Sequence, residues 1–168
     1  MSYVDTSLIV AALDPLDPRQ KSALKALEGE GDKKISEFVI VELASVLSRR
    51  DALYKVFREI GVREELTIPA VILYIMKRFG LKYKRVDGRG RALPLGDFYL
   101  PLAAAVKLSS KFKLKTLDLI HLAYIKTLMD QGEEIFELIT VDDDFEREKG
   151  NIKRELRIDV RTLSSSQT

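Results

Sequence analysis

Short apolar runs of strand length recur along the chain, separated by longer segments in which apolar residues follow a helical period. The expected strands cover residues 2–5, 33–36, 81–86, 135–141 and 158–162. The expected helices cover about 6–13, 17–28, 37–49, 51–60, 64–79, 102–112 and 116–131, with a short one before the last strand. Strands that alternate with helices predict an α/β fold with a mainly parallel central sheet and helices on both faces.

Two segments qualify this outline. The helix expected over 37–49 is apolar on most sides, so we expect more than one of its faces to be buried. The stretch 87–101 is rich in Gly and Pro and has no clear period, which predicts a loop. At 168 residues, the chain is expected to form one three-layer domain over 1–163, with a basic loop insertion near 87–101 and a flexible tail over 164–168.

Acidic residues interrupt or end strongly apolar segments at four places. These residues are Asp5, Glu42, Asp118 and Asp142. Because an unpaired buried carboxylate is costly or stays protonated, the economical explanation is that the four meet around a divalent cation. Asp5 and Asp142 follow expected strands, and the carboxyl ends of parallel strands form the usual functional crevice of such a sheet. Oxygen ligands of this kind suit Mg²⁺ or Mn²⁺.

Four short motifs around these acids resemble those of the PIN-domain ribonucleases and occur in that family's order. They are Asp5-Thr6-Ser7, Val41-Glu42-Leu43, Leu117-Asp118-Leu119-Ile120-His121-Leu122-Ala123 and Thr140-Val141-Asp142-Asp143-Asp144-Phe145. Together they span residues 5–145, which is most of the chain. The chain departs from the family in being longer than a minimal VapC toxin, and the surplus falls around 87–101.

The resemblance implies a PIN fold and a metal-dependent endoribonuclease, most often the VapC-type toxin of a toxin–antitoxin pair. The acids implied to bind Mg²⁺ or Mn²⁺ and to be catalytic are Asp5, Glu42, Asp118 and Asp142, with Asp144 as an auxiliary ligand. The residues implied to orient them are Thr6, Ser7 and Thr140. Which of the three adjacent aspartates at 142–144 ligates the ion stays open. One or two such ions can activate a water and neutralise the scissile phosphate.

The partners implied are an RNA substrate, a small antitoxin that covers the acidic groove, and a second copy of the chain in a homodimer. The apolar segment Ile68 to Met76 could supply the dimer interface or could be core. From Lys77 to Lys115 the chain carries eleven Lys and Arg against two Asp, a net charge of +9, whereas the whole chain carries only +2. This asymmetry favours contact with a polyanion, and solvated surface charge is the alternative. The candidates for phosphate contacts are Arg85, Arg89 and Arg91.

Each acid also has a purely structural explanation. Asp5 or Asp118 could cap the helix beside it, and at least one of the aspartates at 142–144 is expected to cap the helix that follows. Glu42 could form an ion pair, and the arginines closest to it in sequence are Arg49 and Arg50. His121 lies one helical turn from Asp118 and is either a hydrogen-bonded core residue or a neighbour of the site.

The residue inventory excludes several other functions. There is one histidine, so a ribonuclease mechanism that needs two histidines is excluded, and there is no cysteine for a disulfide or a cysteine zinc site. No phosphate-binding loop of the NTPase type is present. The longest apolar run is too short to span a bilayer, so a cytoplasmic protein is expected. The main alternative is a non-catalytic PIN-fold module that binds RNA or protein. A phosphotransfer domain using Asp5 is disfavoured, because Ser7 stands where a second aspartate is expected.

Overall fold

The computed structural model describes residues 1–50, 59, 61 and 63–164. In this part of the chain five strands form one sheet. They are β1 (Ser2–Val4), β2 (Lys33–Ile35), β3 (Leu81–Tyr83), β6 (Glu137–Thr140) and β7 (Asp159–Thr162). Their order across the sheet is β3-β2-β1-β6-β7, and every neighbouring pair is parallel. The predicted α/β class with a parallel central sheet is confirmed.

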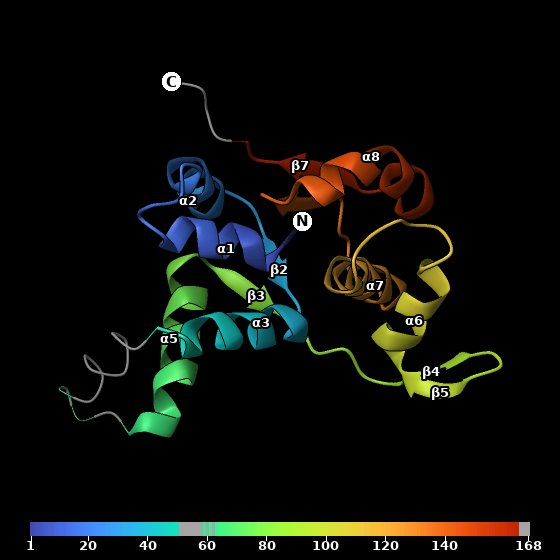
Figure 1. The fold of residues 1–168 in the computed structure, drawn as a ribbon, viewed down its shortest axis with the longest axis horizontal. Coiled ribbons are helices and arrows are strands. Elements are labelled where there is room, and N and C mark those ends of the chain that lie inside the picture. The colour runs from blue at the N-terminus through green and yellow to red at the C-terminus, as the bar shows by residue number, and fades with distance from the viewer. Residues whose placement is uncertain (51–58, 60, 62, 165–168) are drawn as a thin grey trace.

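Helices cover both faces of this sheet. The described helices are α1 (Thr6–Leu13), α2 (Gln20–Glu28), α3 (Glu37–Ser48), α5 (Glu64–Arg78), α6 (Leu100–Leu108), α7 (Thr116–Asp130) and α8 (Asp143–Leu156). The chain steps from β1 to β2 to β3 in one direction and then crosses back to β6 and β7. Because parallel crossovers are right-handed, this reversal places α1 to α5 on one face and α6 to α8 on the other. Figure 1 shows these two groups on the left and the right of the view.

The core is built on the central strand and on the inner sides of the helices. Tyr3 and Val4 of β1 have no exposed surface, because successive strand residues point to opposite faces and both faces are covered. In α3 the fully buried residues form one row, made of Val39, Leu43 and Leu47. Val41 is 63% exposed, so the expectation that several faces of this helix are buried is wrong for the side that carries Val41. The apolar composition of a helix indicates how much of its surface could be buried. The neighbouring elements decide which side of the helix is actually buried.

The stretch 87–101 corrects a second expectation. It contains an antiparallel hairpin instead of a loop, formed by β4 (Arg89–Ala92) and β5 (Gly96–Tyr99), and α6 already begins at Leu100. Tyr99 anchors the hairpin, because its hydroxyl donates to Glu37 of α3 and to the carbonyl of Val86 at 2.7 Å. Four-residue strands that pair only with each other have too few positions to show an alternating pattern, so periodicity does not reveal them.

Two other expected elements lie outside the described residues: most of the helix expected over 51–60, and all but the first residue of the tail over 164–168. The remaining strands are shorter than expected by one to three residues, while their order and type are confirmed. No helix among the described residues has the length and apolar character needed to cross a membrane.

The packing of the hairpin on α6 generates a test of the fold. A Cβ added at Gly90 would lie 2.8 Å from the Cβ of Ala103 and 2.9 Å from Cδ1 of Leu100, so the hairpin would have to shift. We expect Gly90→Ala to lower the free energy of unfolding by about 1–3 kcal/mol, measured by urea denaturation. The matched control is Gly150→Ala in α8, where a Cβ meets nothing within 4 Å and where alanine should stabilise the helix by about 0.5–1 kcal/mol. Equal stability of Gly90→Ala and the wild type would contradict this packing.

Candidate metal centre

The predicted acids meet at the point where the strand order reverses. β1 and β6 are neighbours, and the connections that follow them leave toward opposite faces, which opens a crevice at their carboxyl ends. A cleft of about 770 Å³ lies there, and we call it the acidic cleft. Its lining includes the predicted site residues Asp5, Thr6, Ser7, Glu42, Asp118, Asp142 and Asp144. Residues from four distant segments of the chain thus share one cavity.

A first group of ligands forms around a buried imidazole. Asp5, Glu42 and His121 each offer a ligand atom, and these atoms lie within 4.8 Å of one another. Nε2 of His121 is 3.1 Å from Oδ1 of Asp5 and 2.9 Å from Oε2 of Glu42. On the other side of the ring, Nδ1 is 3.1 Å from the hydroxyl of Tyr3, which is 2.7 Å from Oγ of Ser36. His121 is therefore fixed on both sides, and it holds the two carboxylates together.

The electrostatics of His121 favour its charged form. Burial, the largest single influence, lowers the pKa of this side chain, which is only 2% exposed. The negative charges of Asp5, Glu42 and Asp118, with the hydrogen bond to Glu42, outweigh burial and raise the pKa above its ordinary value. The two interpretations of His121 as a hydrogen-bonded core residue and as a neighbour of the site therefore both describe it.

The three predicted hydroxyl residues contact the acids directly. Oγ1 of Thr140 donates to Oδ2 of Asp5 at 2.7 Å, and Oγ of Ser7 donates to the same oxygen at 2.5 Å. Thr6 donates to Glu42. Thr140 also accepts a hydrogen bond from the backbone nitrogen of Asp142 at 2.9 Å. These contacts fix the orientation of the carboxylates of Asp5 and Glu42, and they connect the end of β1 to the end of β6.

A second group of ligands consists of Asp118, Asp142 and Asp144, again with ligand atoms within 4.8 Å of one another. Oδ2 of Asp118 is buried and has no hydrogen-bond partner among the described residues. Burial, followed by the charges of Asp142 and Asp5, raises the pKa of Asp118 to about 6. Burial and the charge of Asp5 also raise the pKa of Asp142. These three carboxylates repel one another, and one of their oxygens has no partner among the described residues, which is unfavourable for the protein alone. A bound cation would remove both costs.

The donor set fits a hard divalent ion. Five carboxylates in two groups provide oxygen ligands, which suit Mg²⁺ and Mn²⁺, whereas Nε2 of His121 contacts Asp5 and Glu42. The unpartnered oxygen of Asp118 supports this fit independently of the residue types. Asp144 differs from the other acids, because Lys115 and Arg147 both form ion pairs with it.

The structural explanations of the acids have different outcomes. Asp118 is the third residue of α7, whose N-cap position is occupied by Lys115. Asp142 caps α8 by accepting a hydrogen bond from the backbone nitrogen of Asp144 at 2.8 Å, as expected for one aspartate of this trio. Asp5 occupies the N-cap position of α1 but makes no capping hydrogen bond with its side chain. Glu42 bonds to Thr6 and to His121, whereas the ion pair of Arg50 is with Asp14. Capping and a place in the cleft are compatible at Asp142.

The cations that line the acidic cleft differ from the predicted ones. Among the described residues, the arginines in its lining are Arg19, Arg49 and Arg147, whereas Arg85, Arg89 and Arg91 lie on or next to the β4–β5 hairpin. Arg19 donates to the carbonyl of Val141 at 2.8 Å and pairs with Asp17 at 2.9 Å. Its pKa is raised, chiefly by the hydrogen bond to Asp17. Nothing in the local sequence of these arginines indicates that the fold brings them to the acids.

Comparison with known proteins agrees with this geometry. The sequence model of the family described as the PIN domain matches residues 2–150. The chain belongs to the PIN-domain family. This PIN domain also resembles a chain in the crystal structure of VapBC2 from Rickettsia felis bound to a DNA fragment from their promoter. The TM-score is 0.54 at 15% sequence identity, and the match covers 98% of this chain and 100% of that one, which shows a shared fold. None of the curated protein sequences compared matches this PIN domain.

The raised pKa of Asp118 generates a prediction for the metal-free PIN domain. Because its pKa of about 6 in the folded chain exceeds the ordinary value of 3.8, the folded state binds more protons than the unfolded state between these values. The free energy of unfolding therefore falls as the pH rises from about 4 to about 6 and stays lowered above that range. We expect Asp118→Asn to raise the Tm in EDTA at pH 7 by a few degrees, with the difference vanishing near pH 4.

Thermal unfolding in EDTA across this pH range checks the prediction. Asp130→Asn is the matched control, because Asp130 lies at the other end of α7 in an exposed pair with Lys126. Added Mn²⁺ should stabilise the wild type more than Asp118→Asn, since the variant lacks a ligand. A Tm of Asp118→Asn below that of the wild type at pH 7 in EDTA would contradict the account of carboxylate crowding.

Proposed function

We propose that this PIN domain is a metal-dependent endoribonuclease that hydrolyses RNA phosphodiester bonds with Mg²⁺ or Mn²⁺, and that it is the VapC-like toxin of a toxin–antitoxin pair. The observation that carries the proposal is the acidic cleft, which brings together five carboxylates from distant segments, in two groups. One of them, Asp118, has a buried oxygen with no hydrogen-bond partner among the described residues. Membership of the PIN-domain family and a fold shared with a chain of VapBC2 support it.

The residues of the cleft have distinct tasks in this mechanism. Asp5, Glu42, Asp118, Asp142 and Asp144 would hold the metal. A bound Mg²⁺ or Mn²⁺ supplies Lewis-acid chemistry, neutralising charge on the scissile phosphate and activating a water for attack. The hydroxyls of Thr6, Ser7 and Thr140 keep the carboxylates oriented. Both ring nitrogens of His121 are already engaged, so its task is to position Asp5 and Glu42 and not to take a proton from the nucleophile.

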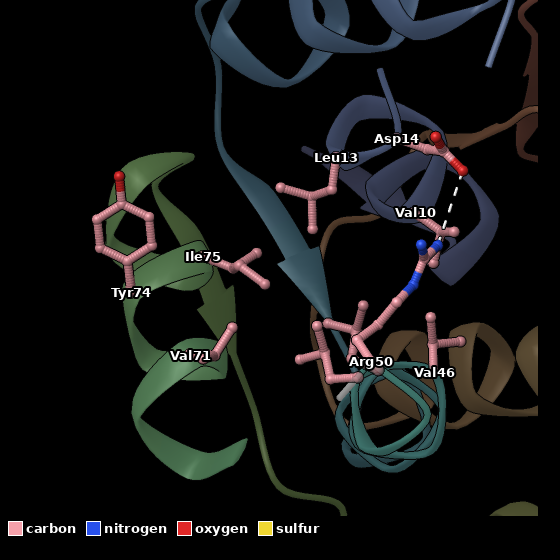
Figure 2. A pocket seen from close by; sticks show the side chains of 10 residues that line it. Val10, Leu13, Asp14, Val46, Arg50, Val71, Tyr74 and Ile75 are labelled. Atoms are coloured by element: carbon pink, nitrogen blue, oxygen red, sulfur yellow. Dashed lines mark ion pairs between the residues drawn. The ribbon is translucent and has the colours of Figure 1, made fainter. Parts of the chain in front are cut away.

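A small antitoxin is proposed as the protein partner, and an apolar groove beside the acidic cleft fits one. The groove has a volume of about 560 Å³ and lies between α1, α3 and α5 (Figure 2). Its lining includes Val10, Leu13, Leu43, Val46, Leu47, Val71, Tyr74 and Ile75. Val10 and Val46 line the acidic cleft as well. An amphipathic segment of the antitoxin could place its apolar face in the groove. A basic residue that follows in this segment would then lie over the acidic cleft, where its charge complements the carboxylates.

Cleavage of RNA tests the proposed activity. We expect the wild type to cut a structured RNA pool in Mn²⁺ or Mg²⁺ and to be inactive in EDTA. Asp5→Asn and Asp118→Asn should each lower the cleavage rate by at least about 10²-fold. Losing a metal ligand should slow the reaction at least as much as losing a residue that only orients a ligand. The products should carry 5′-phosphate and 3′-hydroxyl ends, which end-labelling distinguishes.

The matched control is Asp159→Asn, which removes an exposed carboxylate paired with Lys153 away from the cleft. Its cleavage rate should equal that of the wild type. A folded wild type that binds RNA without cutting it in either metal would favour the alternative, a non-catalytic PIN-fold binding module. Equal activity in EDTA and Mn²⁺ would refute the metal mechanism.

A homodimer is also proposed, through the outer side of α5. Leu66 is 44% exposed and Leu73 is 65% exposed, and at a spacing of seven residues they lie on one face of this helix. Exposed apolar residues on one helix face are typical of an interface between subunits.

Light scattering after size exclusion tests this interface. We expect the wild type to have twice the 19.1 kDa mass of one chain and Leu73→Glu to have the mass of one. Leu102→Glu on α6 is the control, because Leu102 is exposed to 41% on a different helix and should leave the dimer intact. A monomeric wild type would rule out the proposed dimer.

A further inference from the structure

Of the five acids proposed to hold the metal, Asp144 is the one whose two carboxylate oxygens both form ion pairs with a lysine or arginine among the described residues. Nζ of Lys115 lies 2.7 Å from Oδ2 of Asp144, and the guanidinium of Arg147 pairs with Oδ1. The carboxylate is nearly buried, with 11% of its side chain exposed, but the side chains of Lys115 and Arg147 are 79% and 72% exposed. A shielded anion is thus neutralised by two long side chains that extend into solvent.

The two cations come from different segments of the chain. Lys115 immediately precedes α7, the helix that carries Asp118, whereas Arg147 lies on α8, one turn after Asp144. They neutralise Asp144, whereas Oδ2 of Asp118, in the same group of three acids, has no hydrogen-bond partner in the described part of the chain. The direct ion pairs of this group, among the described residues, are therefore all made by Asp144.

The start of α8 does not depend on these ion pairs. Asp142 already caps the helix by accepting from the backbone nitrogen of Asp144. The carboxylate of Asp144 is nearly buried, so it needs a positive charge beside it, which a divalent cation would supply in place of the two exposed side chains. Lys115 and Arg147 are therefore better placed to exchange partners than to hold the helix.

We propose that Lys115 and Arg147 are exchangeable counter-ions: they neutralise Asp144 until a divalent cation takes that carboxylate, and they then turn to RNA phosphates at the edge of the cleft. The inference rests on the proposed function, because it assigns two contacts of the RNA substrate. Arginine matches phosphate in two-point hydrogen bonding, and lysine supplies a flexible point charge. Arg147 also lines the acidic cleft, within which the phosphate must lie for cleavage.

The exchange predicts opposite effects on two affinities. Neutralising Lys115 and Arg147 removes the cations that compete with metal at Asp144, so metal binding should tighten. The same change removes two phosphate contacts, so RNA binding in the presence of metal should weaken. A merely structural role predicts instead a lower Tm with metal affinity unchanged or weakened.

The first experiment measures Mn²⁺ binding without RNA, by isothermal titration calorimetry on the full chain. We expect Lys115→Gln with Arg147→Gln to tighten the Kd for Mn²⁺ by at least about threefold, since both cations leave the acid. Arg49→Gln is the matched control, because Arg49 lines the same cleft while donating to Oγ of Ser45. Its effect should be less than half as large. An unchanged or weaker Mn²⁺ affinity in the double variant would overturn the proposal.

The second experiment measures binding of a fluorescein-labelled single-stranded RNA by anisotropy, with a hydrolysis-resistant RNA backbone so that every protein keeps all of its proposed metal ligands. In Mn²⁺ the double variant should bind about tenfold more weakly, and the slope of log K against log salt should fall by about two. In EDTA the difference should be smaller, because both cations then stay on Asp144. Lys126→Gln, at the far end of α7, should change neither quantity.

The outcomes separate this inference from the proposed function. If RNA is bound and cut by the wild type but the double variant leaves Mn²⁺ affinity unchanged, the exchange is overturned and the nuclease stands. If the wild type binds no RNA in any condition, the proposed function fails and the phosphate contacts fail with it, even where Mn²⁺ binding tightens. Weaker RNA binding of equal size in EDTA and in Mn²⁺ also overturns the exchange, since the cations would then contact RNA without leaving Asp144.

Discussion

Repulsion among carboxylates gathered at one edge of the sheet is the constraint on which the rest of this structure depends. The protein answers it differently at each acid. Asp5 accepts from two hydroxyls and from His121, Glu42 from Thr6 and His121, and Asp144 pairs with two exposed cations. At Asp118 one oxygen has no partner among the described residues, and its pKa is raised accordingly. This incomplete neutralisation is what makes the edge suitable for a divalent cation.

The position of α3 shows how the surrounding elements hold the site. Near the start of this helix, Glu37 accepts hydrogen bonds from Tyr99 at the end of the hairpin. The ring of Phe38 packs edge-on against His121, with ring centroids 4.9 Å apart. One turn later, Glu42 reaches the same imidazole. The hairpin, α3 and the buried His121 thus form one connected unit. A displacement of α3 would separate Glu42 from Asp5.

Most of the architecture and most of the acids could be predicted from the sequence. The strand order of a parallel α/β sheet brings the ends of β1 and β6 together, so Asp5 and Asp142 were expected to meet before any contact was known. Asp118 and Glu42 stood out because carboxylates are rare inside apolar helical segments. The β4–β5 hairpin was missed because its strands are four residues long and pair only with each other. The exposure of Val41 on α3 was missed because most sides of this helix are apolar.

The sequence by itself therefore determined the class of the fold, the order of its elements and the residue types that crowd the cleft, because these follow from local periodicity and from charge within apolar surroundings. Only the tertiary structure decided which groups neutralise each acid. His121 was ambiguous in the sequence, Lys115 stood out only as part of the basic region from Lys77 to Lys115, and Arg19 and Arg147 gave no signal. Ion pairs and hydrogen bonds depend on which distant segments meet and at what distance. That is set by the reversal of strand order at β1 and β6, and it leaves no mark on the sequence around any single residue.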